Sequence, residues 1–88
     1  MLSKKIETQI TLIAYATVSN LFATFHNPKM RGDKFTWEGF PSIAEGMVAA
    51  QVFMNVVCKN KETQQTAEEY GKRVGRGIAE EMVKQMLG

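Results

Sequence analysis

Residues 8–25 form a stretch of 18 residues without a charged side chain. Apolar residues recur in it at spacings of three and four, which predicts a helix, and they cover most of its circumference instead of one stripe. Such a helix has to be buried on most sides. A chain of 88 residues forms one domain with a thin core, so it has little protein with which to bury that helix. The stretch therefore predicts burial that is shared between copies of the chain.

The same stretch is close to the length that spans a membrane, about 20 apolar residues. A second apolar stretch lies at 43–58, so a two-span membrane peptide is the alternative. We favour a domain in water because polar side chains such as Gln9, Asn20 and Asn55 recur in both stretches, and hydrocarbon does not satisfy their hydrogen bonds. We therefore expect a cytoplasmic protein without a membrane partner.

Start and stop signals divide the chain into helices. Ser3 is a candidate N-cap for a first helix over 3–25, which ends before a proline. Ser42 and Glu45 have the spacing of a capping box and predict a second helix over 42–59. The first and second helices are joined by a long aromatic loop over 26–41, and connections of that length are often functional.

A third helix is predicted over 62–87 from its regular apolar spacing. The break before it depends on a drop in hydrophobicity and on Asn60 as an N-cap. A single continuous helix over 42–87 stays open as an alternative. The fold prediction is thus all-α: one three-helix domain over residues 1–88, assembled as a homo-oligomer.

Small residues follow one another at a spacing of four in the third predicted helix. A glycine inside a helix costs about 1 kcal/mol relative to alanine, so two glycines on one ridge need a compensating reason. Small residues at this spacing allow another helix to approach closely. We assign the ridge to an oligomer seam; packing against the first helix of the same chain and contact with a ligand are the alternatives. The ridge consists of Ala67, Gly71, Gly75 and Ala79.

The loop combines aromatic with basic residues. Tryptophan and arginine are enriched at the energetic centres of protein interfaces, so the loop is our candidate partner-binding site. Two alternatives remain: the aromatic residues close the open end of the bundle, or they stack on a nucleotide. The candidate partner-binding residues are Arg31, Phe35, Trp37 and Phe40.

Basic residues of the loop and third helix are candidates for contacting phosphate. The alternative is that the basic residues of the third helix only form a salt-bridged surface in contact with solvent. Acidic residues four positions before basic ones favour the ion pairs Glu68–Lys72, Glu69–Arg73 and Glu80–Lys84. A net charge of +2 is too mild to indicate a nucleic-acid-binding protein. The candidate phosphate-contacting residues are Lys34, Lys72, Arg73 and Arg76.

Catalytic patterns are absent from the sequence. His26 and Cys58 are the only residues of their kinds, so neither a zinc site nor a disulfide within the chain is expected. We expect no cofactor, no metal and no enzymatic activity. The leading hypothesis is an interaction protein that binds and inhibits or regulates another macromolecule, in the manner of phage or mobile-element accessory proteins. An oligomeric nucleotide-binding protein and a weak nucleic-acid-binding protein are the alternatives.

Overall fold

The computed structural model describes residues 2–60 and 64–88, which form helices and turns and contain no strand. The all-α prediction is confirmed. In chain order the elements are α1 (Lys4–Phe25), the 3₁₀ turns η1 (Pro28–Met30) and η2 (Trp37–Gly39), α2 (Phe40–Val52), the π-helical turn η3 (Phe53–Val57), α3 (Cys58–Asn60) and α4 (Gln64–Leu87).

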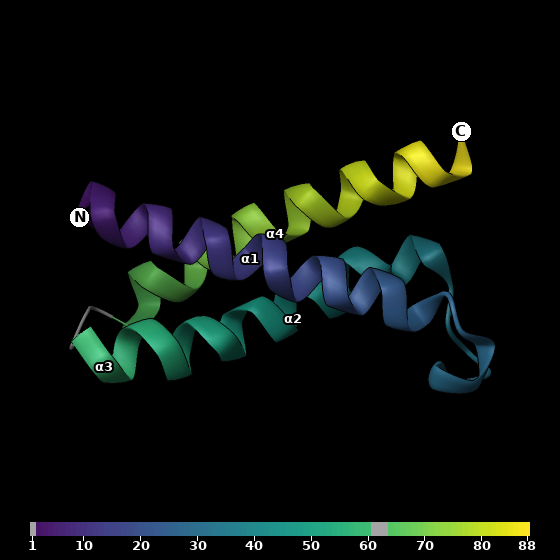
Figure 1. Ribbon diagram of the computed structural model, residues 1–88, viewed down its shortest axis with the longest axis horizontal. Coiled ribbons are helices and arrows are strands. Elements are labelled where there is room, and N and C mark those ends of the chain that lie inside the picture. Colours follow the sequence, from purple (N-terminus) through teal and green to yellow (C-terminus); the bar gives the residue numbers. More distant parts are fainter. Residues whose placement is uncertain (1, 61–63) are drawn as a thin grey trace.

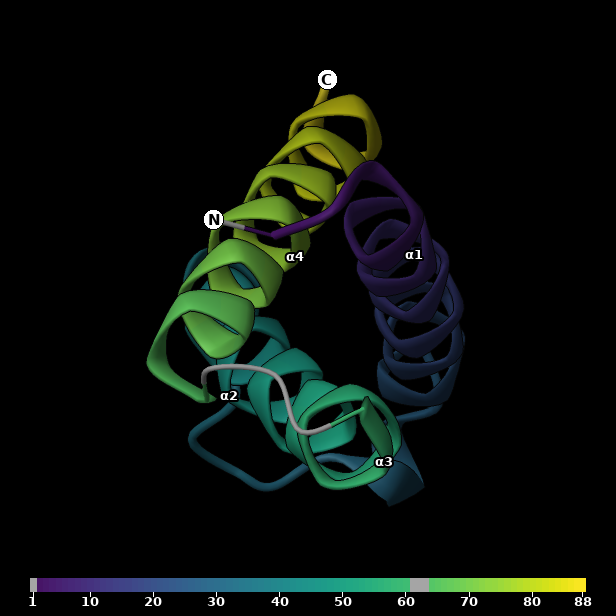
Figure 2. The same ribbon diagram turned by 90° about the vertical axis from the view of Figure 1, so that its left-hand side faces the viewer.

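The helices are arranged as a bundle in which α1 runs along the long axis, α2 returns beside it, and α4 runs back in the direction of α1 (Figure 1). Seen along the bundle, α1, α2 and α4 occupy three corners around a shared core (Figure 2). The most extensive contact joins α2 to α4. Because α4 folds back on α2, one continuous helix over 42–87 is excluded. The expected break around Asn60 lies in part outside the described residues.

Helix α1 begins as its sequence predicts. Ser3 is the N-cap, and its hydroxyl oxygen accepts a hydrogen bond from the Ile6 amide at 3.2 Å. At the other end, His26 Nδ1 donates to the Phe22 carbonyl oxygen at 2.6 Å, so one of the last carbonyls of the helix has a side-chain partner.

Helix α2 begins differently from the prediction. Its N-cap is Gly39, no side chain caps it, and Phe40 and Pro41 already belong to its first turn. Proline is tolerated there because the first amides of a helix have no partner within the helix. The capping box of Ser42 and Glu45 therefore does not form, and the Glu45 carboxylate pairs with α4 instead.

The small-residue ridge of α4 packs inside the chain. A Cβ atom added at Gly71 would lie 2.8 Å from Val52 Cγ2, and one added at Gly75 would lie 2.7 Å from Val48 Cγ2. Both valines belong to α2 and are fully buried. The assignment of this ridge to an oligomer seam is therefore wrong: close approach of α2 within one chain explains the glycines. The ridge residues whose assignment changes are Ala67, Gly71, Gly75 and Ala79, and all four are buried.

Candidate functional site

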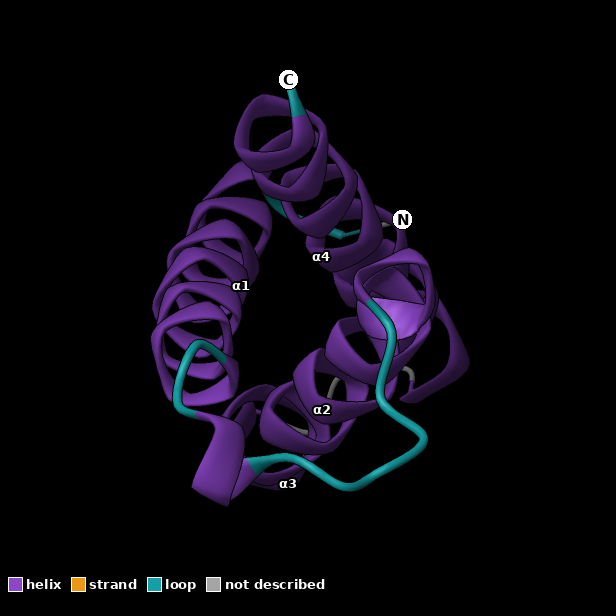
Figure 3. Cartoon of the chain, turned by 90° about the vertical axis from the view of Figure 1, so that its right-hand side faces the viewer, coloured by secondary structure: helices purple, strands orange, loops and turns teal. Residues whose placement is uncertain are grey.

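The connection between α1 and α2 folds over one end of the bundle (Figure 3). The ring centroids of Phe22 and Trp37 are 5.3 Å apart, those of Trp37 and Phe40 5.4 Å, and those of Phe25 and Phe35 5.0 Å. These separations are typical of favourable edge and tilted ring pairs. The aromatic side chains of the connection thus form one cluster with those at the end of α1 and the start of α2, which we call the aromatic cap. It consists of Phe22, Phe25, Phe35, Trp37 and Phe40.

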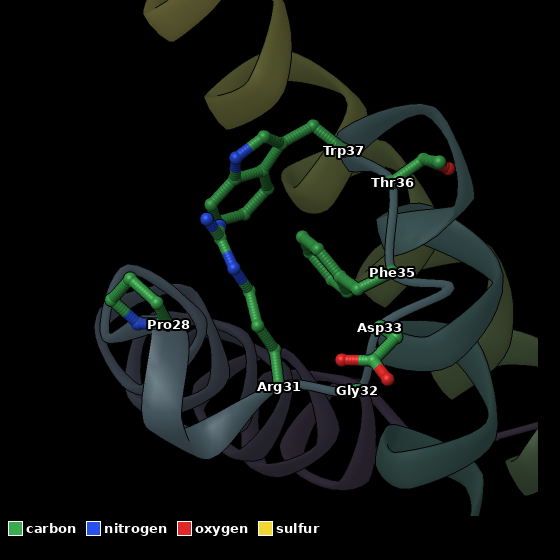
Figure 4. Close-up of a pocket in the computed structure, with 7 residues that line it drawn as sticks. All are labelled: Pro28, Arg31, Gly32, Asp33, Phe35, Thr36 and Trp37. Carbon is green, nitrogen blue, oxygen red and sulfur yellow. The ribbon is translucent and has the colours of Figure 1, made fainter.

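Arg31 is held by the aromatic cap. Its Nη1 donates to the Phe25 carbonyl oxygen at 3.0 Å, and its guanidinium carbon lies 5.4 Å from the centroid of the Phe35 ring. Figure 4 shows the Arg31 side chain extending to the side of the depression on which the Trp37 ring lies, with the Asp33 carboxylate away from its guanidinium. This depression has a volume of about 360 Å³ and is lined by Pro28, Arg31, Gly32, Asp33, Phe35, Thr36 and Trp37.

The four candidate partner-binding residues thus gather at one end of the molecule. Phe40 is fully buried, so it has no surface to offer a partner in this conformation. Phe35 and Trp37 are partly buried against the core. This arrangement matches the alternative in which the aromatic side chains close the bundle. Partner binding through Arg31 and the exposed edges of the two rings stays a prediction.

The candidate phosphate-contacting residues differ in their surroundings. Arg76 Nη1 lies 2.8 Å from a Glu45 carboxylate oxygen, and its Nε lies 3.6 Å from Glu80. The hydrogen bond that Arg76 donates to the Glu45 carboxylate, followed by the charge of Glu80, raises the pKa of Arg76. Arg73 lies over the Tyr70 ring, with its guanidinium carbon 5.3 Å from the centroid.

The expected ion pairs on α4 are not the ones that form. Among residues 2–60 and 64–88, the ion pairs are Arg76–Glu45 and Arg76–Glu80, so Glu80 pairs with Arg76 and not with Lys84. Lys34 and Lys72 have no ion pair in this part of the chain. Lys34 belongs to the connection and the other three candidates belong to α4, so they do not come from one element.

A second depression is a groove between α1 and α2, with a volume of about 470 Å³. Its lining combines apolar side chains with hydroxyl and amide groups and includes no charged residue. The residues that line it are Ile13, Ala16, Thr17, Asn20, Leu21, Met47, Gln51 and Asn55.

The π-helical turn η3 forms one end of this groove. Asn55 Nδ2 donates to the Gln51 carbonyl oxygen at 2.9 Å and to Gln51 Oε1 at 3.1 Å. A π-turn inserts an extra residue into a helix and is often found at functional sites. Sequence reasoning missed this groove; its signal was the recurrence of neutral polar residues in two stretches that are otherwise apolar.

Exposed apolar side chains lie beside the groove on α2 and η3. Ile43 and Met47 of α2 and Met54 of η3 are 40%, 42% and 53% exposed, and their spacing places them along one side of this helical stretch. We call the groove and these side chains the α1–α2 face. It consists of Ile13, Ala16, Thr17, Asn20, Leu21, Ile43, Met47, Gln51, Met54 and Asn55.

The charges of the chain lie away from this face. Residues 8–25 and 46–58 contain no charged side chain, whereas α4 carries exposed acidic and basic residues along its length. An exposed surface of two helices without a single charge is unusual, since charged residues are the ones most often found in contact with water.

Comparison with known proteins finds no matching family model, no matching curated protein and no matching solved structure. One helical stretch in the described structure, Trp37–Val57, is long and apolar enough to cross a membrane by length and composition, a criterion that the core helix of a soluble protein also meets. Among the described residues, no group of His, Cys, Asp or Glu is placed to hold a metal ion.

Proposed function

We propose that this protein is a non-enzymatic interaction protein that docks another protein chain on the α1–α2 face. The observation that supports this function is the absence of charge from an exposed face that carries Ile43, Met47 and Met54. The chain has 11 basic and 9 acidic residues, so charge is scarce on this face and not in the protein as a whole.

The composition of the face resembles the centre of a protein interface. Such centres are depleted in charged residues and enriched in methionine and aromatic residues. Methionine is flexible and polarisable, so it adapts to the shape of a docked surface. Docking of this kind regulates or inhibits a partner by covering its surface, and it requires no catalytic group on this chain.

Site-specific photocrosslinking tests the proposal. A photoreactive amino acid replaces Met47 on the face in one variant and Leu87, which is 61% exposed on α4, in a control variant. In extracts of the source cell we expect protein adducts from position 47 and none from position 87. If position 47 yields no protein adduct, or if both positions yield the same adducts, the α1–α2 face is not a docking surface.

A further inference from the structure

We infer that the partner on the α1–α2 face is a second copy of this chain, docked in a two-fold arrangement. This inference rests on the proposed function and names its partner. In a two-fold interface the same patch occurs on both sides, so any net charge in the patch meets an equal charge of the same sign. Residues 8–25 and 46–58 provide a patch without charge, which is free of that repulsion.

The polar groups of the face are complementary to themselves. Asn20, Gln51 and Asn55 line the groove, and each side-chain amide has both donors and an acceptor. Within the described chain, the Asn20 side chain forms no hydrogen bond, and the carbonyl oxygen of the Asn55 side chain accepts none. The amides of one copy are therefore able to pair with the amides of another.

The dimensions of the face suit a weak dimer. The face runs from Ile13 to Leu21 on α1 and from Ile43 to Asn55 on α2 and η3, and the longer of these two sides is about 20 Å long. Two adjacent helices are about 20 Å wide, so the face has an area of about 400 Å², which is below the about 800 Å² per partner of a standard stable interface and in the range of weak, reversible association.

Other partners fit the face less well. An acidic or a basic partner finds no opposite charge on it. The hydrocarbon core of a membrane leaves exposed groups such as the Asn20 amide without hydrogen-bond partners. A second copy brings both the apolar surface and the amide groups that this face requires.

The test is the molecular mass of the purified full chain, measured by sedimentation velocity over a range of concentrations. We expect a monomer–dimer equilibrium for the wild type. Met47→Arg and Ala16→Arg each place a charge on the face at an exposed position, and we expect each to weaken the dimer by roughly tenfold or more. Leu87→Arg makes a comparable change on α4 and serves as the control, which we expect to dimerise like the wild type.

Circular dichroism shows whether the variants fold. In a second measurement that uses no arginine substitution, chains in which the photoreactive residue replaces only Met47 are mixed as heavy and light isotope forms. An adduct that joins a heavy to a light chain is expected, and its absence overturns the inference even if the arginine variants fail to fold.

The outcomes separate this inference from the proposed function. If the wild type is a monomer at all concentrations, the inference that a second copy occupies the face is overturned. Adducts from position 47 to a different protein would in that case still support the proposed function. A dimer that both folded arginine variants retain places the contact elsewhere and overturns the inference. Binding of the wild type, but not of Met47→Arg, to phosphatidylcholine vesicles identifies a membrane as the occupant and likewise overturns it.

Discussion

Gly75 and Gly77 lie two residues apart on α4 and have opposite surroundings. A Cβ atom at Gly75 would lie 2.7 Å from Val48 Cγ2 and 3.1 Å from Val48 Cβ, whereas one at Gly77 would meet nothing within 4 Å. The position of Val48 Cβ is set by the backbone of α2, so a rotamer change does not make room for it. Gly75 thus allows α2 and α4 to approach, and Gly77 has no such role in this structure.

We expect Gly75→Ala to lower the free energy of unfolding by up to about 2 kcal/mol, because overpacking a core costs about 1–3 kcal/mol and about 1 kcal/mol of this is offset by the gain in helix propensity. Gly77→Ala is the matched control, and we expect it to raise the free energy of unfolding by up to about 1 kcal/mol. Urea unfolding monitored by circular dichroism measures both. Equal stabilisation by the two substitutions contradicts the close α2–α4 contact.

The Arg76–Glu45 ion pair joins the same two helices at the surface. Both side chains are partly exposed, with 46% and 32% of their surfaces accessible, so solvent screens their attraction. We expect Arg76→Gln to lower the free energy of unfolding only slightly, with a smaller loss at high salt. Urea unfolding at low and high ionic strength checks this, and a large, salt-independent loss would show that Arg76 has a different structural role.

At the scale of elements, α2 begins where its aromatic contacts require it to begin. Phe40 is fully buried, and its ring lies 5.8 Å from Phe22 and 6.0 Å from Phe25 at the end of α1. This burial draws Phe40 and Pro41 into the first turn of the helix. The aromatic cap therefore couples the end of α1 to the start of α2.

Phe40→Ala tests the aromatic cap. Removal of a fully buried phenylalanine side chain costs about 3–5 kcal/mol, and we expect a loss of that size. Phe53→Ala makes the same chemical change at a side chain that is 38% exposed, so its loss should be clearly smaller. Thermal unfolding gives both values, and Trp37 fluorescence reports on the cap because its ring lies 5.4 Å from Phe40. Similar losses for the two variants would mean that the cap contributes little.

At the scale of the whole molecule, charged and uncharged surfaces are separated. The exposed side of α4 is charged, whereas the α1–α2 face contains no charge. Solvent is a suitable environment for the first surface, and a neutral protein surface is a suitable one for the second. This separation gives the small bundle one side on which a second chain can be docked without charge repulsion.

If a second copy covers the α1–α2 face, the melting temperature should rise with protein concentration, because association stabilises the folded state by mass action. The dimer dissociation constant should change little with salt, since no charges meet across the face. Differential scanning calorimetry at several concentrations and sedimentation at low and high salt check these two expectations. A melting temperature that is independent of concentration argues against association.

The sequence by itself determined the helical nature of the chain, the N-cap at Ser3 and the need for close packing along the glycine ridge of α4. These features depend on side-chain spacing and on local backbone chemistry, which neighbouring residues specify. Only the tertiary structure decided that α2 is the partner of that ridge, that Phe40 begins α2, and that Asn55 lies in a groove formed with α1. These outcomes depend on contacts between residues far apart in the chain, and periodicity shows which residues need a partner but not which surface becomes that partner.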